Sequence, residues 1–302
     1  SQAVFRRYDN QLPITEPTRG GNLLGFNQFI NVESPMDKLL LILTTISWLV
    51  PEIPRLIIAI AGGTGTGKTT YHRLIQHLID PNVIELGKLP DDIDELEQYL
   101  DHHYVSIFDN ISYISDKQND VLARAITGAG TEKRTLYTND GVSSRRYMRC
   151  IGFNGLGMVV KKADMYSRCL VIDWMPISGA RLTDKALKLK IETDASELRG
   201  AMFDVLVKAM SIYPIIKVKE ESRMHDSVIW LISIGKALGL EQAEVETAYS
   251  YNLQRQDEET VSSDLIAETI VEYMVMNPDT KINMNTTELK KHLEEFKPEL
   301  HR

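Results

Sequence analysis

Apolar residues along this chain follow two different spacings. Apolar side chains that recur every three or four positions predict amphipathic helices, and short continuous apolar runs bounded by turn residues predict buried strands. The predicted strands cover residues 56–61, 82–86, 104–109, 150–153 and 169–174. The predicted helices cover residues 36–49, 71–79, 91–100, 117–127, 197–213, 226–238, 241–254, 262–276 and 286–296.

Strands alternate with helices between residues 56 and 174. This order predicts an α/β fold with a parallel sheet, whose ligands bind at the carboxyl edge of the strands. The helical pattern that follows predicts a lid packed on the sheet domain. The expected parts are an N-terminal arm and helical segment (1–50), a core (51–178), a helical lid (179–260) and a C-terminal helical extension (261–302) that can begin a winged helix.

A glycine-rich turn joins the first predicted strand to the helix at 71–79. Its pattern, GxxxxGK[ST], predicts a phosphate-binding loop, because glycines let backbone N–H groups point at phosphate oxygens beside a helix N-terminus. Lys68 is expected to reach the β- and γ-phosphates of ATP, and Thr69 to bind Mg²⁺. The alternative is a turn that binds nothing. The predicted nucleotide-binding residues are Gly62, Gly63, Thr64, Gly65, Thr66, Gly67, Lys68, Thr69 and Thr70.

A carboxylate ends the predicted strand at 104–109. Asp109 is expected to hold Mg²⁺ beside the loop, although an aspartate in this place can also cap the next helix. Asn110 follows where many such ATPases carry a glutamate that activates water. An amide orients water but does not accept its proton, so the general base stays open.

Three further polar residues are candidates for contacts with the nucleotide. Asn154 ends the strand at 150–153 and is expected to hold the γ-phosphate or the attacking water, or else to be a turn residue before glycine. Arg168 precedes the last predicted strand, where it is expected to reach a neighbouring subunit's nucleotide, or else to form a surface ion pair. Arg199 of the lid is a candidate for a γ-phosphate contact, with an exposed helix arginine as the alternative.

Charge is distributed unevenly along the chain. The formal net charge is −8, and residues 85–120 hold ten acids and two lysines, whereas residues 131–149 hold five basic residues and two acids. Asn-Asp-Gly between two β-rich runs predicts a hairpin there, at about 131–153. A basic hairpin beside an ATPase sheet favours contact with single-stranded DNA, and a solvated charged hairpin is the alternative. The residues concerned are Lys133, Arg134, Arg145 and Arg146.

The rest of the composition is typical of an ordinary globular protein. The longest apolar stretch, residues 39–50, is too short to span a bilayer, and the N-terminus lacks an apolar signal core. The two cysteines, Cys150 and Cys169, lack metal-type spacing and suit two buried thiols in a reducing cytoplasm. The sequence therefore predicts a cytoplasmic protein without a membrane segment.

Six motifs occur in a characteristic order, at residues 62–69, 108–110, 127–128, 134–138, 152–155 and 164–168. Together they resemble AAA+ replicative helicase domains of plasmids, viruses and integrated elements, whose better-known relatives are the superfamily 3 and minichromosome-maintenance helicases. The resemblance covers roughly residues 36–260. It implies an AAA+ ATPase core that assembles into a ring, expected to be hexameric, and that is often fused behind a primase.

By this resemblance Lys68 and Thr69 look like Walker A, Asp109 like Walker B, Asn154 like sensor 1 and Arg168 like the trans-acting arginine finger. The basic hairpin looks like one that projects into a ring channel. The sequence departs from the pattern at Asn110, which replaces the usual glutamate, and Arg199 matches the lid arginine only loosely.

The favoured function is an ATP-dependent DNA helicase or translocase that replicates a mobile element. A P-loop kinase of a small metabolite is an alternative, because the loop also resembles those of nucleoside kinases. A non-translocating AAA+ switch that assembles partners is another, and Asn110 suits it. DNA-stimulated ATPase activity separates these hypotheses.

Overall fold

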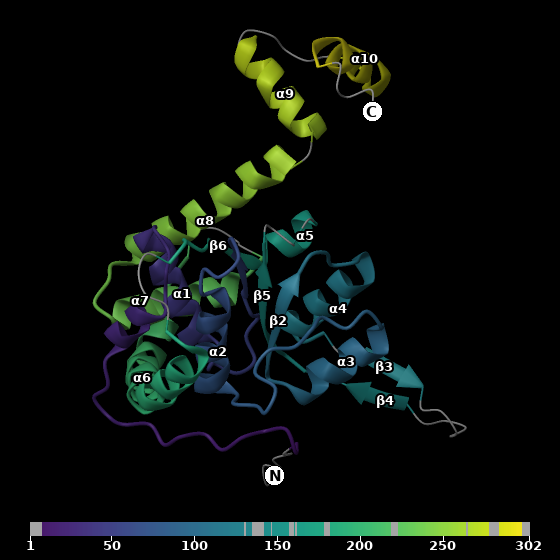
Figure 1. The fold of residues 1–302 in the computed structure, drawn as a ribbon. Coiled ribbons are helices and arrows are strands. Elements are labelled where there is room, and N and C mark those ends of the chain that lie inside the picture. Colours follow the sequence, from purple (N-terminus) through teal and green to yellow (C-terminus); the bar gives the residue numbers. More distant parts are fainter. Residues whose placement is uncertain are drawn as a thin grey trace. The chain divides into compact units, whose positions relative to one another are not determined.

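A computed structural model describes residues 8–129, 131–134, 142–145, 147–156, 160, 162–177, 182–218, 223–263, 265–277 and 284–297. The chain divides into two compact units, Ser1–Asn252 and Leu253–Arg302. Figure 1 shows the order of the elements along the chain. The arm, the core and most of the lid expected from the sequence belong to the first unit.

The first unit is built around a four-stranded parallel sheet with the strand order β2-β5-β1-β6. Every residue of β1 and β5 is buried, as expected for strands that are covered on both faces. The predicted α/β fold class with a parallel sheet is therefore confirmed. The strands are β1 (Ile57–Ala61), β2 (Val105–Ile111), β5 (Cys150–Gly155) and β6 (Cys169–Asp173).

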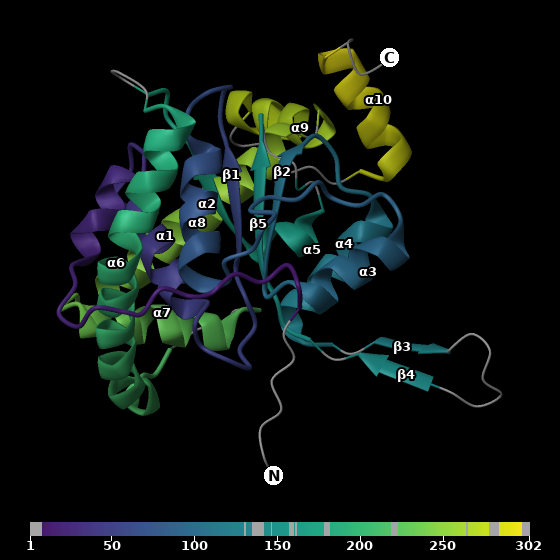
Figure 2. The same ribbon diagram turned by 60° about the horizontal axis from the view of Figure 1, so that its bottom comes forward.

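Helices cover both faces of this sheet (Figure 2). On one face, apolar residues of α3 and α4 pack against β1, β2, β5 and β6 through a cluster that includes Phe108 and Phe153. On the other face lie α1, α2, α6 and α7. The bounds are α1 (Pro35–Ser47), α2 (Lys68–Ile79), α3 (Ile93–His102), α4 (Asp116–Thr127), α5 (Ala163–Tyr166), α6 (Asp184–Ile212) and α7 (His225–Ala237).

The side chains of a strand alternate between these two faces. On β5, Ile151 and Phe153 belong to the cluster under α3 and α4, so that Gly152 and Asn154 face α2. On β2, Phe108 belongs to the same cluster, whereas Asp109 contacts α2. The polar residues at the carboxyl edge of the sheet therefore gather on the side of α2.

The edge strand β6 is paired on its open side by a side chain. Asn252, in α8 (Gln242–Ser263), accepts a hydrogen bond from the Val171 backbone N–H at 3.2 Å and donates one to the Val171 carbonyl at 2.7 Å. The amide imitates a further strand at this position, which protects the edge from pairing with another chain.

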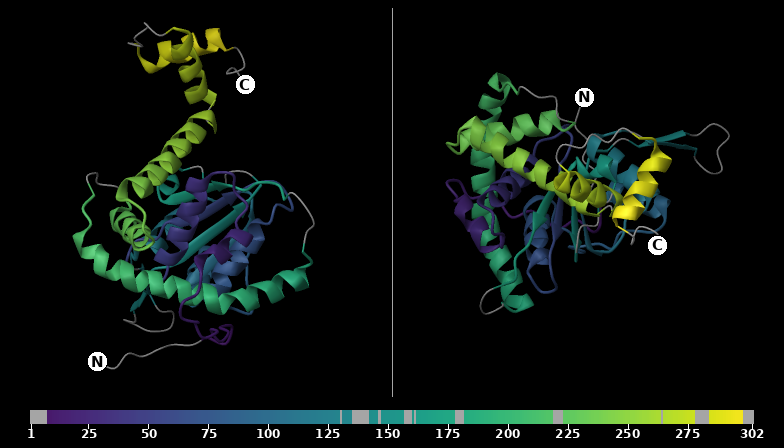
Figure 3. Two further views of the ribbon diagram at one scale, coloured as in Figure 1. Left: turned by 90° about the vertical axis from the view of Figure 1, so that its left-hand side faces the viewer. Right: turned by 90° about the horizontal axis from the view of Figure 1, so that it is seen from above.

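Figure 3 shows α6 as one long helix beside the sheet. It covers 29 residues and begins well before the predicted helix at 197–213, because Thr183 caps it by accepting a hydrogen bond from the Ala186 N–H. Two 3₁₀ turns lie in this unit as well, η1 (Leu23–Gln28) and η2 (Tyr213–Ile215).

Residues 16–21 of the N-terminal arm pack along α6. The Thr18 N–H donates to the Ser196 carbonyl at 3.0 Å, and the Ser196 hydroxyl donates to the Glu16 carbonyl at 2.6 Å. A Cβ atom at Gly200 would lie 1.7 Å from the Thr18 carbonyl oxygen. Glycine is therefore required where the arm crosses the helix.

The predicted strand at 82–86 does not form, so this expectation is wrong. The segment has only isolated bridges at its ends, from Asn82 to Gln11 of the arm and from Gly87 to Phe108 of β2. The arm bonds to the backbone of this segment instead of a sheet strand, since the Val83 N–H donates to the Asn10 carbonyl.

The predicted hairpin is present as β3 (Thr131–Arg134) and β4 (Val142–Arg145), an antiparallel pair in which Thr131 lies opposite Arg145 and Arg134 opposite Val142. Figure 2 shows the pair projecting away from the four-stranded sheet. Residues 135–141, and Arg146 of the predicted DNA-binding set, lie outside the described residues.

The second unit holds the end of α8 and the helices α9 (Leu265–Met276) and α10 (Thr286–Phe296). Asn285 caps α10 in a capping box with Glu288. The described residues of this unit form helices, and the winged helix stays a prediction. In the described part of the chain, no helix is both long enough and apolar enough to cross a bilayer.

Candidate nucleotide-binding site

The glycine-rich loop lies between β1 and α2, as the sequence predicts. Gly67 is the N-cap of α2 at φ 91°, and no side chain caps this helix end. A Cβ atom at Gly62 (φ 153°) would lie 2.7 Å from the Trp174 carbonyl oxygen, so glycine is required there too. Thr70 N–H donates to the Gly67 carbonyl, and no side chain caps the other N–H groups at this helix start, which suits an anion.

Lys68 is folded back onto this loop. Its Nζ donates to the carbonyl oxygens of Gly62 at 2.5 Å and Gly63 at 2.6 Å. Partial burial lowers the pKa of Lys68, and the negative charge of Asp109 acts in the opposite direction. The loop therefore holds the ammonium group on its own carbonyls, within the field of the Asp109 carboxylate.

Thr69, in the first turn of α2, lies beside Asp109 of β2. The Thr69 hydroxyl donates to Asp109 Oδ2 at 3.4 Å, a long hydrogen bond. The Asn110 backbone N–H donates to Asp109 Oδ1 at 3.0 Å, and Asn110 itself is exposed with φ 54° at an irregularity in the pairing of β2 and β5. Asp109 does not cap the next helix, because Ser115 caps α4 in a capping box with Gln118.

Asn154 is buried in β5, beside Ile60 of β1. It is therefore not a turn residue. Its Oδ1 lies 2.7 Å from Nδ1 of His72, a fully buried residue of α2, and its Nδ2 has no hydrogen-bond partner among the described residues. Burial lowers the pKa of His72 to about 4, although the hydrogen bond with Asn154 and the charge of Asp109 act to raise it.

His72 is a site residue that the sequence did not predict. In the sequence, His72 is a polar residue that follows Tyr71 and lies between the apolar positions of an amphipathic helix. Such a histidine is easily taken for a surface residue, since nothing in the local pattern shows that Gly152 leaves room for its ring.

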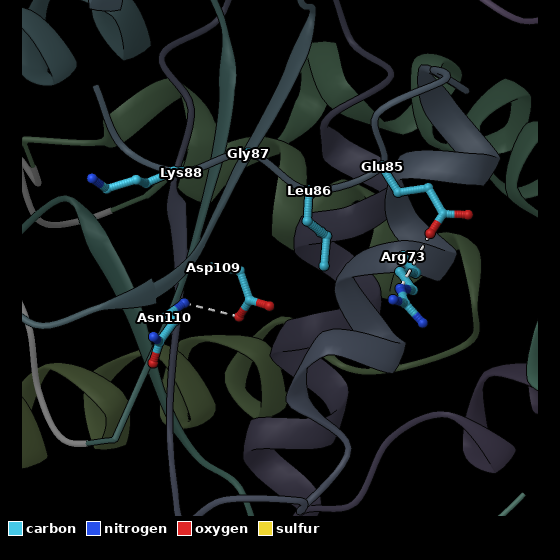
Figure 4. A pocket seen from close by; sticks show the side chains of 7 residues that line it. All are labelled: Arg73, Glu85, Leu86, Gly87, Lys88, Asp109 and Asn110. Carbon is cyan, nitrogen blue, oxygen red and sulfur yellow. Dashed lines mark hydrogen bonds and ion pairs between the residues drawn. The ribbon is translucent and has the colours of Figure 1, made fainter. Parts of the chain in front are cut away.

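Two cavities flank the start of α2. One, of about 570 Å³, lies beside Asp109 and includes the ion pair of Arg73 with Glu85 (Figure 4). It is lined by Arg73, Glu85, Leu86, Gly87, Lys88, Asp109 and Asn110.

The other cavity, of about 560 Å³, lies against the loop on the side of Trp174. Its wall combines loop residues with apolar side chains and with amides of η1. The Trp174 indole N–H is buried and has no hydrogen-bond partner in the described part of the chain. The lining residues are Asn27, Gln28, Phe29, Ile30, Asn31, Gly65, Thr66, Gly67, Thr69, Thr70, Trp174, Ile177, Leu182 and Leu187.

Arg168 lies at the amino edge of the sheet. Its carbonyl accepts a hydrogen bond from the N–H of Ile57, the first residue of β1, whereas the phosphate loop follows the last residue of that strand. Roughly 13 Å of strand separates the two ends. Arg168 therefore does not reach the loop of its own chain.

Asp164 holds Arg168 in place. The Arg168 guanidinium donates to both carboxylate oxygens of Asp164, at 3.2 and 3.3 Å, and Arg223 pairs with the same carboxylate. Burial acts to raise the pKa of Asp164, but the hydrogen bonds and charges of the two arginines outweigh it and lower the pKa. In the single chain Arg168 thus forms an ion pair, which was the alternative expected from the sequence.

The expected γ-phosphate contact of Arg199 is wrong, and so is its alternative, an exposed helix arginine. Arg199 is buried, and its guanidinium donates to the carbonyls of Thr15, His77 and Leu78. The last two lie at the C-terminal end of α2, roughly 15 Å along the helix from Lys68.

Arg149, one of the five basic residues counted in the hairpin region, also has a structural role. It donates to the carbonyls of Leu100 and Asp101 at the end of α3. The strand β4 ends before it. Lys133, Arg134 and Arg145 belong to the strands of the hairpin, and their DNA contacts stay predictions.

Residues 21–255 match the family model of the actinomycete integrative conjugative element replication protein. The chain belongs to this family. The match covers the sheet, the glycine-rich loop, the hairpin and the helices α6 and α7. No curated protein sequence matches the chain.

Several solved structures are similar to this replication protein. The NrS-1 C-terminal region in its apo form has 15% sequence identity and a TM-score of 0.48, with 94% of this chain and 65% of that chain covered. The SCCmec type IV Cch active helicase has 13% identity and a TM-score of 0.44, with 88% and 58% covered. The JCV helicase, bound to an acetamide compound, has 12% identity and a TM-score of 0.34, with 70% and 68% covered. This chain thus spans about two thirds or less of the length of the first two.

Proposed function

We propose that this replication protein is an ATP-dependent DNA helicase or translocase that works as a ring with shared ATP sites. One observation carries the proposal. The open N-terminus of α2, Lys68 and the Thr69–Asp109 pair meet at the carboxyl edge of one sheet. This combination suits a nucleoside triphosphate, because it offers backbone N–H donors, a cation and two oxygen ligands in one place.

The binding mode follows from the cavity next to Trp174. The phosphates of ATP lie on the loop, and Lys68 exchanges its two carbonyl partners for phosphate oxygens. The base and the sugar occupy the cavity, where apolar side chains such as Phe29 and Ile177 supply contact area and the indole N–H supplies a donor. Cavities of this size and mixed chemistry are typical of cofactor sites.

The oxygen ligands of this site fit Mg²⁺, which prefers hydroxyl and carboxylate oxygens together with phosphates. No cluster of three or more His, Cys, Asp or Glu residues that could hold a metal occurs among the described residues. Thr69 and Asp109 are the residues that would hold it. The ion would neutralise charge on the phosphates as the terminal one is transferred to water.

Two residues act on the attacking water in this proposal. Asn154 presents a buried amide without a partner at the sheet edge, where it holds the water or the γ-phosphate. Asn110, exposed beside Asp109, orients water without taking its proton. A non-translocating AAA+ switch remains the second candidate, because Asn110 supplies no general base.

Arg168 supports shared sites. It does not reach its own loop, and it lies partly exposed beside Asp164 and Arg223. We assign it to the nucleotide of the next subunit, with the cavity beside Asp109 as the point of entry. The projecting hairpin, through Lys133, Arg134, Arg145 and Arg146, is assigned to the backbone of single-stranded DNA.

The test is ATP hydrolysis by the purified protein with and without single-stranded DNA. We expect hydrolysis that DNA stimulates, and Lys68→Ala should abolish it because the phosphates lose their cation. The matched control is Lys208→Ala, which removes an exposed lysine of α6. Hydrolysis that DNA leaves unchanged supports the switch, and near-native hydrolysis by Lys68→Ala removes the proposal.

A further inference from the structure

We infer that His72 is a positioning residue for Asn154, holding the carboxamide so that its amide group faces the nucleotide site. The inference rests on the proposed function, and it assigns a role to a residue outside the recognised motifs. The two residues are 82 positions apart in the chain and meet between α2 and β5.

The contact depends on the alternation of side chains along β5. Gly152 and Asn154 are two residues apart and both face α2. The His72 ring lies over Gly152, where a Cβ atom would be 2.7 Å from its Nε2, and reaches Asn154 with Nδ1. Both side chains are almost fully buried, at 0% and 1% exposure. Water therefore does not compete for this hydrogen bond.

The surroundings of the His72 ring favour one of its two neutral tautomers. Burial keeps His72 neutral at neutral pH, so one ring nitrogen carries a proton and the other does not. Nε2 lies against Gly152 and has no hydrogen-bond partner among the described residues. A proton on Nε2 would be a buried N–H without an acceptor among the described residues, and such an unsatisfied donor is rare and costly. The proton therefore belongs on Nδ1.

A protonated Nδ1 donates to the Asn154 oxygen and so determines which way the carboxamide is turned. The Nδ2 group is then the end that has no partner among the described residues. Asn154 belongs to β5, which lies between β1 and β2 in the sheet. The glycine-rich loop follows β1, and β2 carries Asp109. In the proposed function, a phosphate or water oxygen bound at this edge of the sheet accepts a hydrogen bond from Nδ2. In the reverse orientation an oxygen would face the phosphates and repel them.

A double-mutant cycle tests this role. We expect Asn154→Ala to lower kcat about 100-fold, as the loss of one preorganised donor does. His72→Leu should lower kcat by at least about 10-fold with nucleotide Kd nearly unchanged, because Asn154 is then free to turn. The double variant should be no slower than Asn154→Ala, because His72 acts only through Asn154. His72→Asn, whose amide can donate from the position of Nδ1, should recover part of the rate.

Two results would overturn the inference. One is a double variant whose rate is the product of the two single losses, and the other is a native kcat in folded His72→Leu. A second measurement is independent of hydrolysis: ¹⁵N spectra of the histidine rings in the whole protein should show His72 protonated at Nδ1, with the signal assigned by its loss in His72→Asn. The opposite tautomer contradicts the inference. A wild-type protein that hydrolyses no ATP contradicts the proposed function instead, and the ring spectrum still decides the position of the proton.

Discussion

The Nε atom of Arg199 donates a hydrogen bond to the Leu78 carbonyl oxygen at 2.9 Å, at the C-terminal end of the helix that follows the phosphate loop. A second nitrogen of the same guanidinium donates to the His77 carbonyl, also at 2.9 Å. The last carbonyls of a helix lack partners within it, and a cation there also interacts favourably with the helix dipole. Arg199 thereby joins α6 to α2.

Arg199→Ala should lower the free energy of unfolding by about 2–3 kcal/mol, because buried carbonyls lose a charged donor. The Kd for ATP of the folded protein should stay within about twofold of wild type, since the residue is remote from the loop. Urea unfolding and nucleotide titration measure the two effects, with Lys208→Ala as an exposed control on the same helix. A large loss of ATP affinity at unchanged stability would return Arg199 to the nucleotide.

Asp109→Ala should still bind nucleotide, more weakly, but should not hydrolyse it, because the metal loses its carboxylate ligand. Titration of the ATPase with Mg²⁺ is the measurement. Asp116→Ala, at the exposed first residue of α4, is the matched control and should keep the wild-type metal dependence. If Asp109→Ala keeps it as well, Asp109 is not a metal ligand.

Replacing Arg145 and Arg146 together with Ala should weaken binding to single-stranded DNA by a similar factor for every sequence. The dependence of log K on log salt should become flatter by about 0.7 for each phosphate that the variant no longer neutralises. Titrations at two salt concentrations measure this. Arg149→Ala is a useful comparison, because Arg149 is engaged at the end of α3 and its removal should affect stability rather than the salt slope. Selective weakening for one DNA sequence would indicate base recognition instead.

Arg168→Ala should bind ATP almost normally but hydrolyse it on the order of 10³-fold more slowly, as expected for the loss of an arginine finger. Mixing it with Lys68→Ala should restore partial activity, because some interfaces then pair an intact loop with an intact finger. Mixtures that stay inactive although both variants enter the same ring show that Arg168 serves only its ion pair with Asp164.

His72 should make the stability of the fold sensitive to acid. Its native pKa of about 4 lies below the ordinary value of 6.5, so the unfolded chain takes up the proton first. The contribution of the neutral ring to the free energy of unfolding is therefore complete above pH 6.5. It is lost as the pH falls from 6.5 to 4, and the loss amounts to about 3 kcal/mol. Denaturant unfolding of wild type and His72→Asn across this range measures it, and equal slopes for the two proteins would contradict the burial of a neutral ring.

Features that depend on neighbouring residues could be predicted from the sequence alone. The glycine-rich loop is a contiguous pattern, so its place between β1 and α2 followed from the pattern. The strand that carries Asp109 and the hairpin around Asn-Asp-Gly were local signals too. Both cysteines are buried thiols, as the absence of metal-type spacing indicated.

Contacts between distant segments depended on the tertiary structure. Arg199 looked like a surface or phosphate-binding arginine, because arginines are rarely buried and a helical pattern does not show which carbonyls await a donor. The strand expected at 82–86 did not form, and at Val83 the backbone N–H bonds to Asn10 of the N-terminal arm instead. The pairing of His72 with Asn154 depends on the order of the strands and on the space above Gly152, which are set by packing across the whole sheet.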